Sequence, residues 1–515
     1  MYARTNTAAI NGITAYHVEI ESHIENGLPS FQIVGLPDGA IRESRERVMA
    51  ALKNSRYPIQ PKRIVVNLAP ADVRKEGSAF DLAIAIGMLA AFDVIDVELV
   101  GNCVLLGELA FDGSVRPIHG ALSIAMMVSK QRKYGRVLLP SANADEAAVV
   151  DGVDIIPIDS LQDTVNILTG IEARNPHKVD IASIIREAQT KHAVDLADVK
   201  GQEGVKRAME IAAAGGHNLI MIGPPGAGKT MLAKRLPTIL PPLTVAEALE
   251  TTKIHSVAGL LPPGQALVTR RPFRAPHHTI SDAALVGGGV GVVRAGEISL
   301  AHHGVLFLDE LPEFQRNVLE VLRQPLEDKR ITVARSKMTV DYPANVMLVC
   351  SMNPCPCGHF GDLSHECTCK PLDVQKYMGR VSGPLLDRID IHVDVPSVGI
   401  DALANAPPGT PSSVVRERVL TARERQKHRF SGQTGLYKNA DMTTKDIERM
   451  CKLDDAGAAV LKAAMVKLGL SARAYDRILK VARTIADLAE SENIRREHVA
   501  EAVQYRTLDR PYWNG

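Results

Sequence analysis

The sequence predicts an α/β protein in three parts, the last of them helical. A strand-like run at 218–222 leads through a glycine-rich turn into a helix-like run, as in a βα unit. An apolar run at 305–308 ends on Asp309 and Glu310, which is typical of a buried parallel strand. From 441 onward, apolar residues recur at helical spacing. A chain of 515 residues is also too long for one core, because a domain takes about 100–200 residues.

The expected domain division follows from the alternation of strand-like and helix-like runs. It comprises an N-terminal α/β domain at 1–170, a polar linker at 171–195, an α/β core at 196–400, a linker with a charged helix at 401–440 and a helical lid at 441–515. The clearest further strands are expected at 63–68, 136–139 and 346–351, and the clearest helices at 81–91, 121–133 and 414–430.

Composition and charge narrow the function classes. Hydrophobic residues make up 45% and charged residues 23%, as in an ordinary globular protein. The formal net charge is only +1, so contact with nucleic acid would need local basic surfaces. Aromatic residues amount to 4%, which argues against rows of base-stacking platforms. With no apolar run near the roughly 20 residues of a membrane span and no visible secretory signal, we expect a cytoplasmic protein without a membrane partner.

The run 223–231 has the composition of a phosphate-binding loop that opens a helix. Glycines permit a tight turn and a close approach of backbone N–H groups to the phosphates of ATP. The lysine of this run would pair with the β and γ phosphates, and the threonine hydroxyl would bind Mg²⁺. The residues expected to bind the nucleotide are Gly223, Pro224, Pro225, Gly226, Ala227, Gly228, Lys229, Thr230 and Met231.

Two carboxylates complete the expected hydrolysis site. Asp309 at the end of its strand would hold Mg²⁺, and Glu310 would orient and polarise the attacking water. Together with Lys229 and Thr230, this pair indicates ATP hydrolysis rather than nucleotide storage.

The block RPFRAPHHTISDAALVGGG…RAGEISLAHHGVLFLDELPEF at 271–314 resembles the magnesium-chelatase-like AAA+ proteins, and within them the group that serves bacterial competence. The resemblance extends over nearly the whole chain. It implies a P-loop AAA+ core with a helical lid, assembled as a homohexamer.

The resemblance also implies further residues at the site. Asn353 matches the sensor-1 position beside the γ-phosphate, and Arg473 matches a sensor-2 arginine that reaches the phosphates from the lid. Arg388 is the expected arginine finger, with Arg380 as a second candidate; a finger from a neighbouring subunit accelerates related NTPases by about 10³–10⁵. For each arginine the alternative is a surface salt bridge.

Two insertions are expected to contact DNA in the pore of the ring. One lies at 269–296; the other is a probable hairpin at 330–340, just before sensor 1. Its basic tip, Arg335, Ser336 and Lys337, would follow a phosphate backbone without reading bases. The alternative is a solvated turn.

Four of the seven cysteines form two short pairs. Cys355, Cys357, Cys367 and Cys369 suit a tetrahedral structural Zn²⁺ site, although the pairs are closer than the common two-residue spacing. His359 and His365 lie between the pairs and are alternative ligands. The alternatives to a metal site are reduced free cysteines or a redox pair. The remaining cysteines, expected in the core, are Cys103, Cys350 and Cys451.

The N-terminal 170 residues resemble the Lon-type proteolytic domain, which has a ribosomal-S5-like fold. Lon proteases use a Ser–Lys dyad, but the matching positions here are Ala79 and Ile124, with Ser78 one place early. Peptidase activity is therefore not expected. A basic run on a probable helix is either a DNA contact or, more simply, a solvated face alternating with glutamates; it comprises Arg42, Arg45 and Arg47.

These features favour an ATP-dependent hexameric DNA motor, a helicase or branch-migration enzyme. The resemblance implies that it acts on single-stranded and branched DNA, with recombination proteins as possible partners, when incoming DNA is integrated during natural transformation. The alternatives are a metal-chelatase motor subunit, a MoxR-like chaperone that remodels a protein, and an ATP-dependent protease, which lacks its dyad here.

Overall fold

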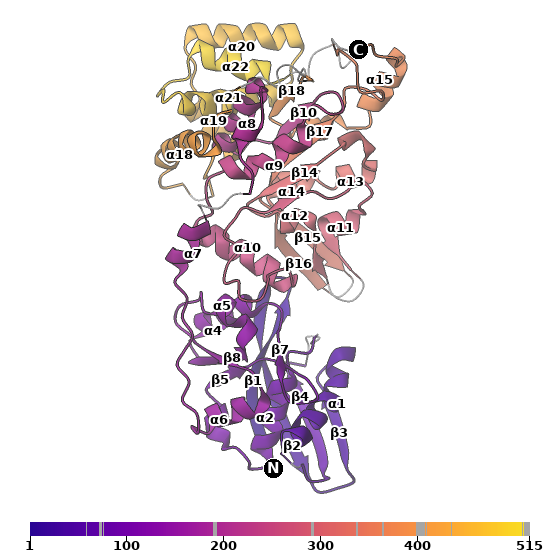
Figure 1. The fold of residues 1–515 in the computed structure, drawn as a ribbon, viewed down its shortest axis with the longest axis vertical. Coiled ribbons are helices and arrows are strands. Elements are labelled where there is room, and N and C mark those ends of the chain that lie inside the picture. The colour runs from indigo at the N-terminus through magenta and orange to yellow at the C-terminus, as the bar shows by residue number, and fades with distance from the viewer. Residues whose placement is uncertain are drawn as a thin grey trace.

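The computed structural model describes residues 1–508 except 58, 72–74, 76, 189–192, 290–292, 336–337, 363–364, 398–406, 408, 434 and 507. The molecule is elongated, with the N-terminal sheet at one end, a parallel sheet in the middle and a helical cluster beside it at the other end (Figure 1). Within the described residues, none of the helices combines the length and the apolar character that crossing a bilayer requires.

The N-terminal part is a seven-stranded mixed sheet in the order β3-β4-β2-β1-β5-β8-β9. The strands are β1 (Tyr2–Asn11), β2 (Thr14–Glu25), β3 (Ser30–Val34), β4 (Arg63–Ala69), β5 (Cys103–Leu105), β8 (Arg136–Pro140) and β9 (Asp154–Ile158), with a small separate pair β6 (Glu108–Leu109) and β7 (Val115–Arg116). The helices are α1 (Gly39–Asn54), α2 (Asp81–Ala91), α3 (Val97–Val100), α4 (Ala121–Gln131), α5 (Ala144–Ala147) and α6 (Leu161–Leu168). Every residue of α2 is buried, because this apolar helix packs into the sheet core.

The central part is a five-stranded, all-parallel sheet in the order β11-β14-β17-β10-β18. Its strands are β10 (Leu219–Ile222), β11 (Phe273–Arg274), β14 (Val305–Leu308), β17 (Met347–Met352) and β18 (Ile391–Asp394). Its helices are α8 (Glu203–Gly215), α9 (Lys229–Ile239), α10 (Val245–Val257), α11 (Asp282–Val286), α12 (Glu297–Leu300), α13 (Arg316–Glu320), α14 (Arg323–Asp328), α15 (Pro371–Met378) and α16 (Gly383–Leu386). Three of the strands are buried along their whole length, as expected of a sheet covered on both faces.

Two hairpins project from the central part. One, β12 (Gly287–Gly288) with β13 (Arg294–Ala295), lies in the first insertion. The other, β15 (Arg330–Arg335) with β16 (Met338–Pro343), confirms the hairpin expected before sensor 1. It lies toward the N-terminal domain (Figure 1), and Val340 of β16 packs directly under the β1–β2 turn at Gly12.

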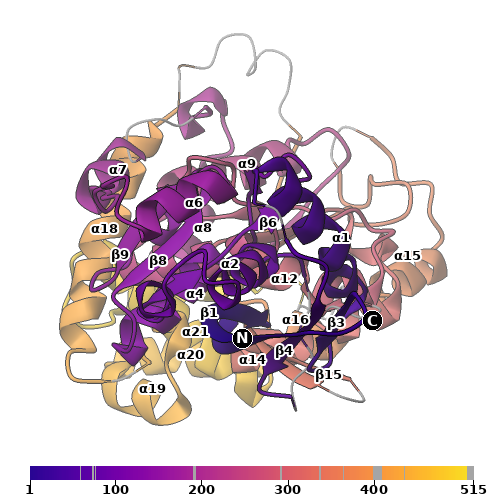
Figure 2. The same ribbon diagram turned by 90° about the horizontal axis from the view of Figure 1, so that it is seen from below.

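The C-terminal helices are α18 (Ser412–Arg429), α19 (Thr444–Met450), α20 (Asp455–Leu468), α21 (Ala472–Leu488) and α22 (Arg496–Gln504). Their apolar side chains join those of α8 and α9 in one hydrophobic cluster. The expected polar linker contains a short helix, α7 (Ile181–Ala188), whose apolar residues pack beside α4 and α10. Seen from below, the N-terminal sheet lies in front of the central part (Figure 2).

Candidate active site

The loop between β10 and α9 lies at the carboxyl edge of the parallel sheet. Gly226 and Gly228 take left-handed backbone angles, with φ of +77° and +86°, which other residues rarely adopt. A side chain at Gly223 would collide with the backbone oxygen of Val395, so only glycine fits there. In this bare loop no side chain caps the first backbone N–H groups of α9, so an anion can bind to them.

Lys229 crosses this loop and ends beside the next strand. Its Nζ donates to the backbone oxygens of Gly223 at 2.6 Å and Pro224 at 2.9 Å, and to Oδ1 of Asn353 at 3.1 Å. Burial lowers the pKa of Lys229 below its ordinary value, an effect that Asp309 opposes. The sequence-predicted Lys229 and Asn353 are thus brought together, although 124 residues separate them.

Thr230 and Asp309 face each other at the same edge. The Thr230 hydroxyl donates to Asp309 Oδ2 at 2.6 Å. Ser351, near the end of β17, donates to the other carboxylate oxygen and accepts the Glu310 N–H at 3.4 Å. Sequence reasoning did not identify Ser351; its place two residues before Asn353 is the signal that could have found it.

Glu310 has its backbone in the left-handed region, with φ of +54°, and its side chain is 59% exposed. Its carboxylate extends toward solvent beside the bare loop, where Oε2 lies 3.8 Å from Nδ1 of His278. The ring of His278 lies 4.1 Å from that of His277, tilted by 34°, and meets Phe314 edge-on. It is a second residue that the sequence did not reveal, and it belongs to the first insertion.

The donors present fit ATP and Mg²⁺. Two hard oxygen ligands, the Thr230 hydroxyl and an Asp309 carboxylate oxygen, lie side by side, which suits Mg²⁺. A buried ammonium and a glycine loop lie next to them, which suits a polyphosphate.

The four cysteines expected to bind metal converge in one cluster. The sulfurs of Cys355, Cys357 and Cys367 lie 3.3, 3.6 and 3.8 Å apart, and the Cys369 sulfur accepts the Cys357 N–H at 3.3 Å. A tetrahedron with Zn–S bonds of about 2.3 Å has edges of about 3.8 Å, so the spacing fits Zn²⁺. A hydrogen bond from the backbone N–H of His359 holds the pKa of Cys357 well below its usual range, whereas burial raises the pKa of Cys369 to about 12.

The two histidines of this loop do not join the thiol cluster. His359 and His365 both turn Nδ1 toward Oδ2 of Asp362, at 3.1 and 3.6 Å. The cysteine loop itself rests on the phosphate-binding loop: a methyl group at Gly358 would lie 2.5 Å from Cδ of Pro225. The cysteine loop therefore packs against the phosphate-binding loop and supports it from one side.

Arg388 lies away from the bare loop of its own chain. It is buried between α14 and α16, where Nη2 pairs with Glu327 and Nη1 donates to the Pro384 oxygen at 2.6 Å. Neither of these partners belongs to the loop 223–230.

The other two arginines lie at the surface. Arg473, with 66% of its side chain exposed, pairs with Asp387 at 3.6 Å, directly beside Arg388. Arg380 pairs with Glu313 at 3.1 Å. Within the described residues, no hydrogen bond or ion pair is recorded between Arg473 and the loop 223–230. The ion pair thus joins Arg473, on α21, to the residue that precedes Arg388 in the sequence.

The expected DNA contacts fall mostly outside the described residues. Ser336 and Lys337 lie there, as does the side chain of Arg335, whose backbone pairs with Met338 at the end of the hairpin. The insertion at 269–296 is described except at 290–292.

The two positions of the Lon dyad meet in the N-terminal domain but carry apolar side chains. Ile124 is buried, and Ala79 packs against the same hydrophobic cluster. The neighbouring Ser78 donates to Glu108 instead. This pair cannot transfer a proton.

Of the basic run on α1, Arg47 is a structural residue rather than a solvated one. Its Nε lies 2.6 Å from Oδ2 of the fully buried Asp81, and Nη2 lies 3.1 Å from Oδ1. Arg45 pairs with its neighbour Glu46, and Arg42 is exposed. The alternation of charges in the sequence did not distinguish Arg47 from the others.

Family models match most of the chain. The model described as "Magnesium chelatase, subunit ChlI" matches residues 195–403, "Subunit ChlI of Mg-chelatase" matches 20–143, and "Magnesium chelatase, subunit ChlI C-terminal" matches 409–506.

Curated relatives cover the chain from end to end. The competence protein ComM of Haemophilus influenzae is 45% identical over 510 residues, which span 97% of this chain and 96% of the relative. The protein YifB of Escherichia coli is 43% identical over 507 residues, 98% and 97% of the two chains. An archaeal Lon protease of Methanocaldococcus jannaschii is 23% identical over 113 residues, 22% of this chain. The chain therefore belongs to the magnesium-chelatase-like AAA+ family, in the group that contains ComM and the YifB proteins.

Proposed function

We propose that this protein is an ATP-driven DNA motor that acts as a homohexamer on single-stranded and branched DNA. The observation that carries the proposal is the joint placement of Lys229, Thr230, Asp309 and Asn353 at one edge of a parallel sheet. A storage site needs the phosphate loop, whereas hydrolysis also needs an aligned carboxylate such as Glu310.

In this proposal each residue has a distinct task. Lys229 leaves its backbone acceptors and binds the β and γ phosphates, and Asn353 orients the γ-phosphate end. Glu310, exposed beside the loop, takes the proton of the attacking water. Thr230 and Asp309 would hold Mg²⁺, which neutralises phosphate charge when bound.

Arg388 completes the site of the neighbouring subunit. A guanidinium stabilises charge that develops on the transferred phosphoryl group, and related fingers increase rates by about 10³–10⁵. Since Arg473 lies beside it through Asp387, we assign both arginines to the same intersubunit site. The lid then senses the neighbour's nucleotide together with the core.

DNA is the proposed substrate for two reasons. The hairpin at β15 and β16 ends on Arg335, Ser336 and Lys337, a short basic run suited to a phosphate backbone. The relative ComM is named a competence protein, and we carry that role over to this chain as a proposal. We therefore infer a helicase or branch-migration role during natural transformation, in the cytoplasm and with recombination proteins as partners.

We further propose the following division of the chain: an N-terminal Lon-like domain at 1–170, a linker at 171–195, the AAA+ core at 196–400, a linker and charged helix at 401–440 and the lid at 441–515. The two sheets and the C-terminal helical cluster support it. Because the dyad positions are apolar, the N-terminal domain serves in assembly or DNA binding rather than in proteolysis.

We propose that the cysteine cluster holds one structural Zn²⁺. The fit of the sulfur spacing to a ZnS₄ tetrahedron supports this. Metal analysis of the purified protein should give one zinc per chain, and the Cys355→Ser, Cys369→Ser double variant should lose it. Zinc in that double variant at the wild-type level would reject the site.

The motor proposal is tested by branch migration on a three-way DNA junction. Wild type should move the branch with ATP, and Lys229→Ala should not. Arg335→Ala combined with Lys337→Ala should keep basal ATP turnover but lose DNA movement. If the wild type fails on junctions and forks alike while hydrolysing ATP, a protein-remodelling ATPase becomes the better description.

A further inference from the structure

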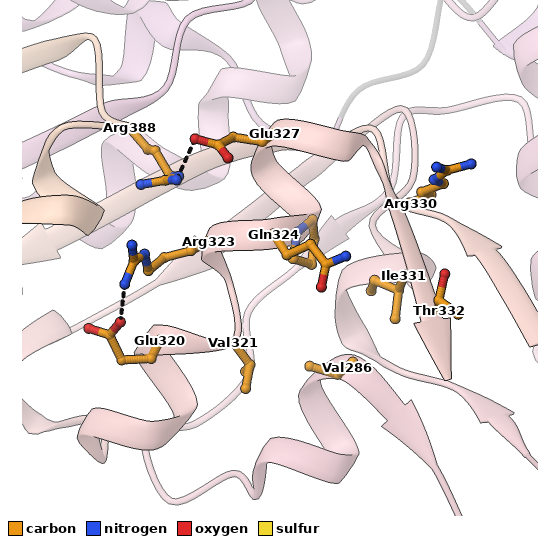
Figure 3. A pocket seen from close by; sticks show the side chains of 11 residues that line it. Val286, Glu320, Val321, Arg323, Gln324, Glu327, Arg330, Ile331, Thr332 and Arg388 are labelled. Atoms are coloured by element: carbon orange, nitrogen blue, oxygen red, sulfur yellow. Dashed lines mark hydrogen bonds and ion pairs between the residues drawn. The ribbon is translucent and has the colours of Figure 1, made fainter. Parts of the chain in front are cut away.

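A cavity of about 450 Å³ lies where α13, α14 and the first residues of β15 meet the buried Arg388 (Figure 3). Two ion pairs cross its edge in the same view. Glu320 pairs with Arg323 at 2.8 Å, and Glu327 pairs with Arg388. The two pairs are chemically alike, but only the second involves the proposed arginine finger.

The ion pair with Glu327 holds the Arg388 side chain in a buried position. Nη2 of Arg388 forms an ion pair with the Glu327 carboxylate, and Nη1 donates a hydrogen bond to the Pro384 oxygen. Only 8% of the residue is exposed to solvent. Its Nε is buried without a hydrogen-bond partner among the described residues. With both terminal nitrogens occupied, the guanidinium is not available to a phosphate on another subunit. To bind such a phosphate, Arg388 has to break its ion pair with Glu327.

Glu327 is joined to the hairpin by a very short segment. Helix α14 ends at Asp328, Lys329 takes a left-handed turn with φ of +55°, and β15 begins at Arg330. The strand packs on the core through the buried side chains of Ile331 and Val333. Since only two residues separate Glu327 from the strand, a displacement of β15 along its axis moves the carboxylate as well.

We propose that Glu327 is a positioning residue that latches Arg388 until the hairpin at β15 and β16 is displaced. Displacement of the hairpin by DNA withdraws the carboxylate, and Arg388 then turns to the neighbouring subunit's ATP. This inference rests on the proposed function, because it takes Arg388 as the finger and DNA as the ligand of the hairpin. It predicts that ATP turnover stays low when no DNA is bound.

Glu327→Gln tests the latch in the full-length protein without DNA. The amide keeps the shape of the side chain but removes its charge, so the resting kcat for ATP should rise about fivefold, which corresponds to about 1 kcal/mol for a partly exposed ion pair. The KM for ATP should stay unchanged, because Lys229 and the bare loop are untouched. Glu320→Gln is the matched control in the same cavity and should leave the resting rate as in wild type. Glu327→Asp retains the carboxylate, so its resting turnover should stay as slow as that of wild type.

Two further arms separate a failed latch from a failed motor. In an Arg388→Ala background, Glu327→Gln should change the residual rate no further, since the latch acts only through the finger. Wild type with and without forked DNA tests the DNA motor independently of the latch. The latch is overturned if Glu327→Gln leaves the resting kcat unchanged or lowers it, if Glu320→Gln raises it equally, or if the effect persists without Arg388.

Discussion

The contact between the cysteine loop and the phosphate-binding loop gives a sharp prediction for Gly358→Ala. The added methyl carbon would lie 2.5 Å from Cδ of Pro225, and an ordinary contact starts at 3.4 Å, so one of the loops has to shift by about 0.9 Å. Misplacement of a catalytic group by about 1 Å can cost about 10²-fold in rate, so we expect kcat/KM for ATP to fall by about 10- to 100-fold.

The matched control for this prediction is Gly361→Ala in the same loop. Gly361 also has a left-handed backbone, with φ of +77°, but a methyl group there meets no atom of the described residues within 4 Å. Both variants therefore carry a similar backbone strain of about 1 kcal/mol, and only Gly358→Ala pushes on Pro225.

The assay is the affinity for a fluorescent ATP analogue together with steady-state turnover, with thermal unfolding recorded for both variants. Gly358→Ala should bind the analogue more weakly than Gly361→Ala at a similar melting temperature. Equal loss in the two variants, or no loss in either, would refute the reasoning that the cysteine loop supports the nucleotide loop.

Three other predictions concern single side chains. Glu310→Gln should retain ATP affinity in a binding assay but lose about 10²–10⁴-fold in kcat, because the water loses its base; undiminished turnover would remove Glu310 from the site. Arg47→Ala should destabilise the protein by about 3 kcal/mol in urea unfolding, since Asp81 is left buried without its partner, whereas Arg42→Ala should not; equal effects would contradict the structural role. Burial beside His302 lowers the pKa of His303 to about 4, from an ordinary value near 6.5. The unfolded chain therefore binds this proton first, and stability should fall by up to about 3 kcal/mol as pH drops from about 6.5 to 4; His303→Asn should flatten that dependence, and an unchanged slope of urea midpoints would contradict it.

The sequence predicted what is encoded locally. The loop 223–230 and the strand before Asp309 were identifiable because each follows from neighbouring residues: a glycine turn between strand and helix, and an apolar run that ends on carboxylates. The expected helix at 81–91 is confirmed with both ends, because its apolar run is bounded by aspartates.

The sequence could not predict contacts that depend on how distant elements pack. Ser351 reaches Asp309 only because β17 lies beside β14 in the sheet, and Gly358 meets Pro225 only because the cysteine loop folds back. Arg47 looked like part of a solvated face, since nothing in its helix reveals that Asp81 lies beneath it.

For Arg388, the sequence predicted the role of the residue but not its partner. Its motif marked it as a finger, but the motif carries no information about Glu327, which lies 61 residues earlier and pairs with it across the cavity. Charge pairing of this kind is set by the three-dimensional arrangement and is visible only there.

The central claim is that ATP hydrolysis in this protein is coupled to DNA. The most direct measurement is the steady-state rate of ATP hydrolysis by the purified full-length protein with and without forked DNA, with Lys229→Ala as the background control. We expect DNA to raise kcat severalfold in wild type and to have no effect in Lys229→Ala, which should be inactive throughout. Hydrolysis by wild type at the same rate with and without DNA would contradict the account.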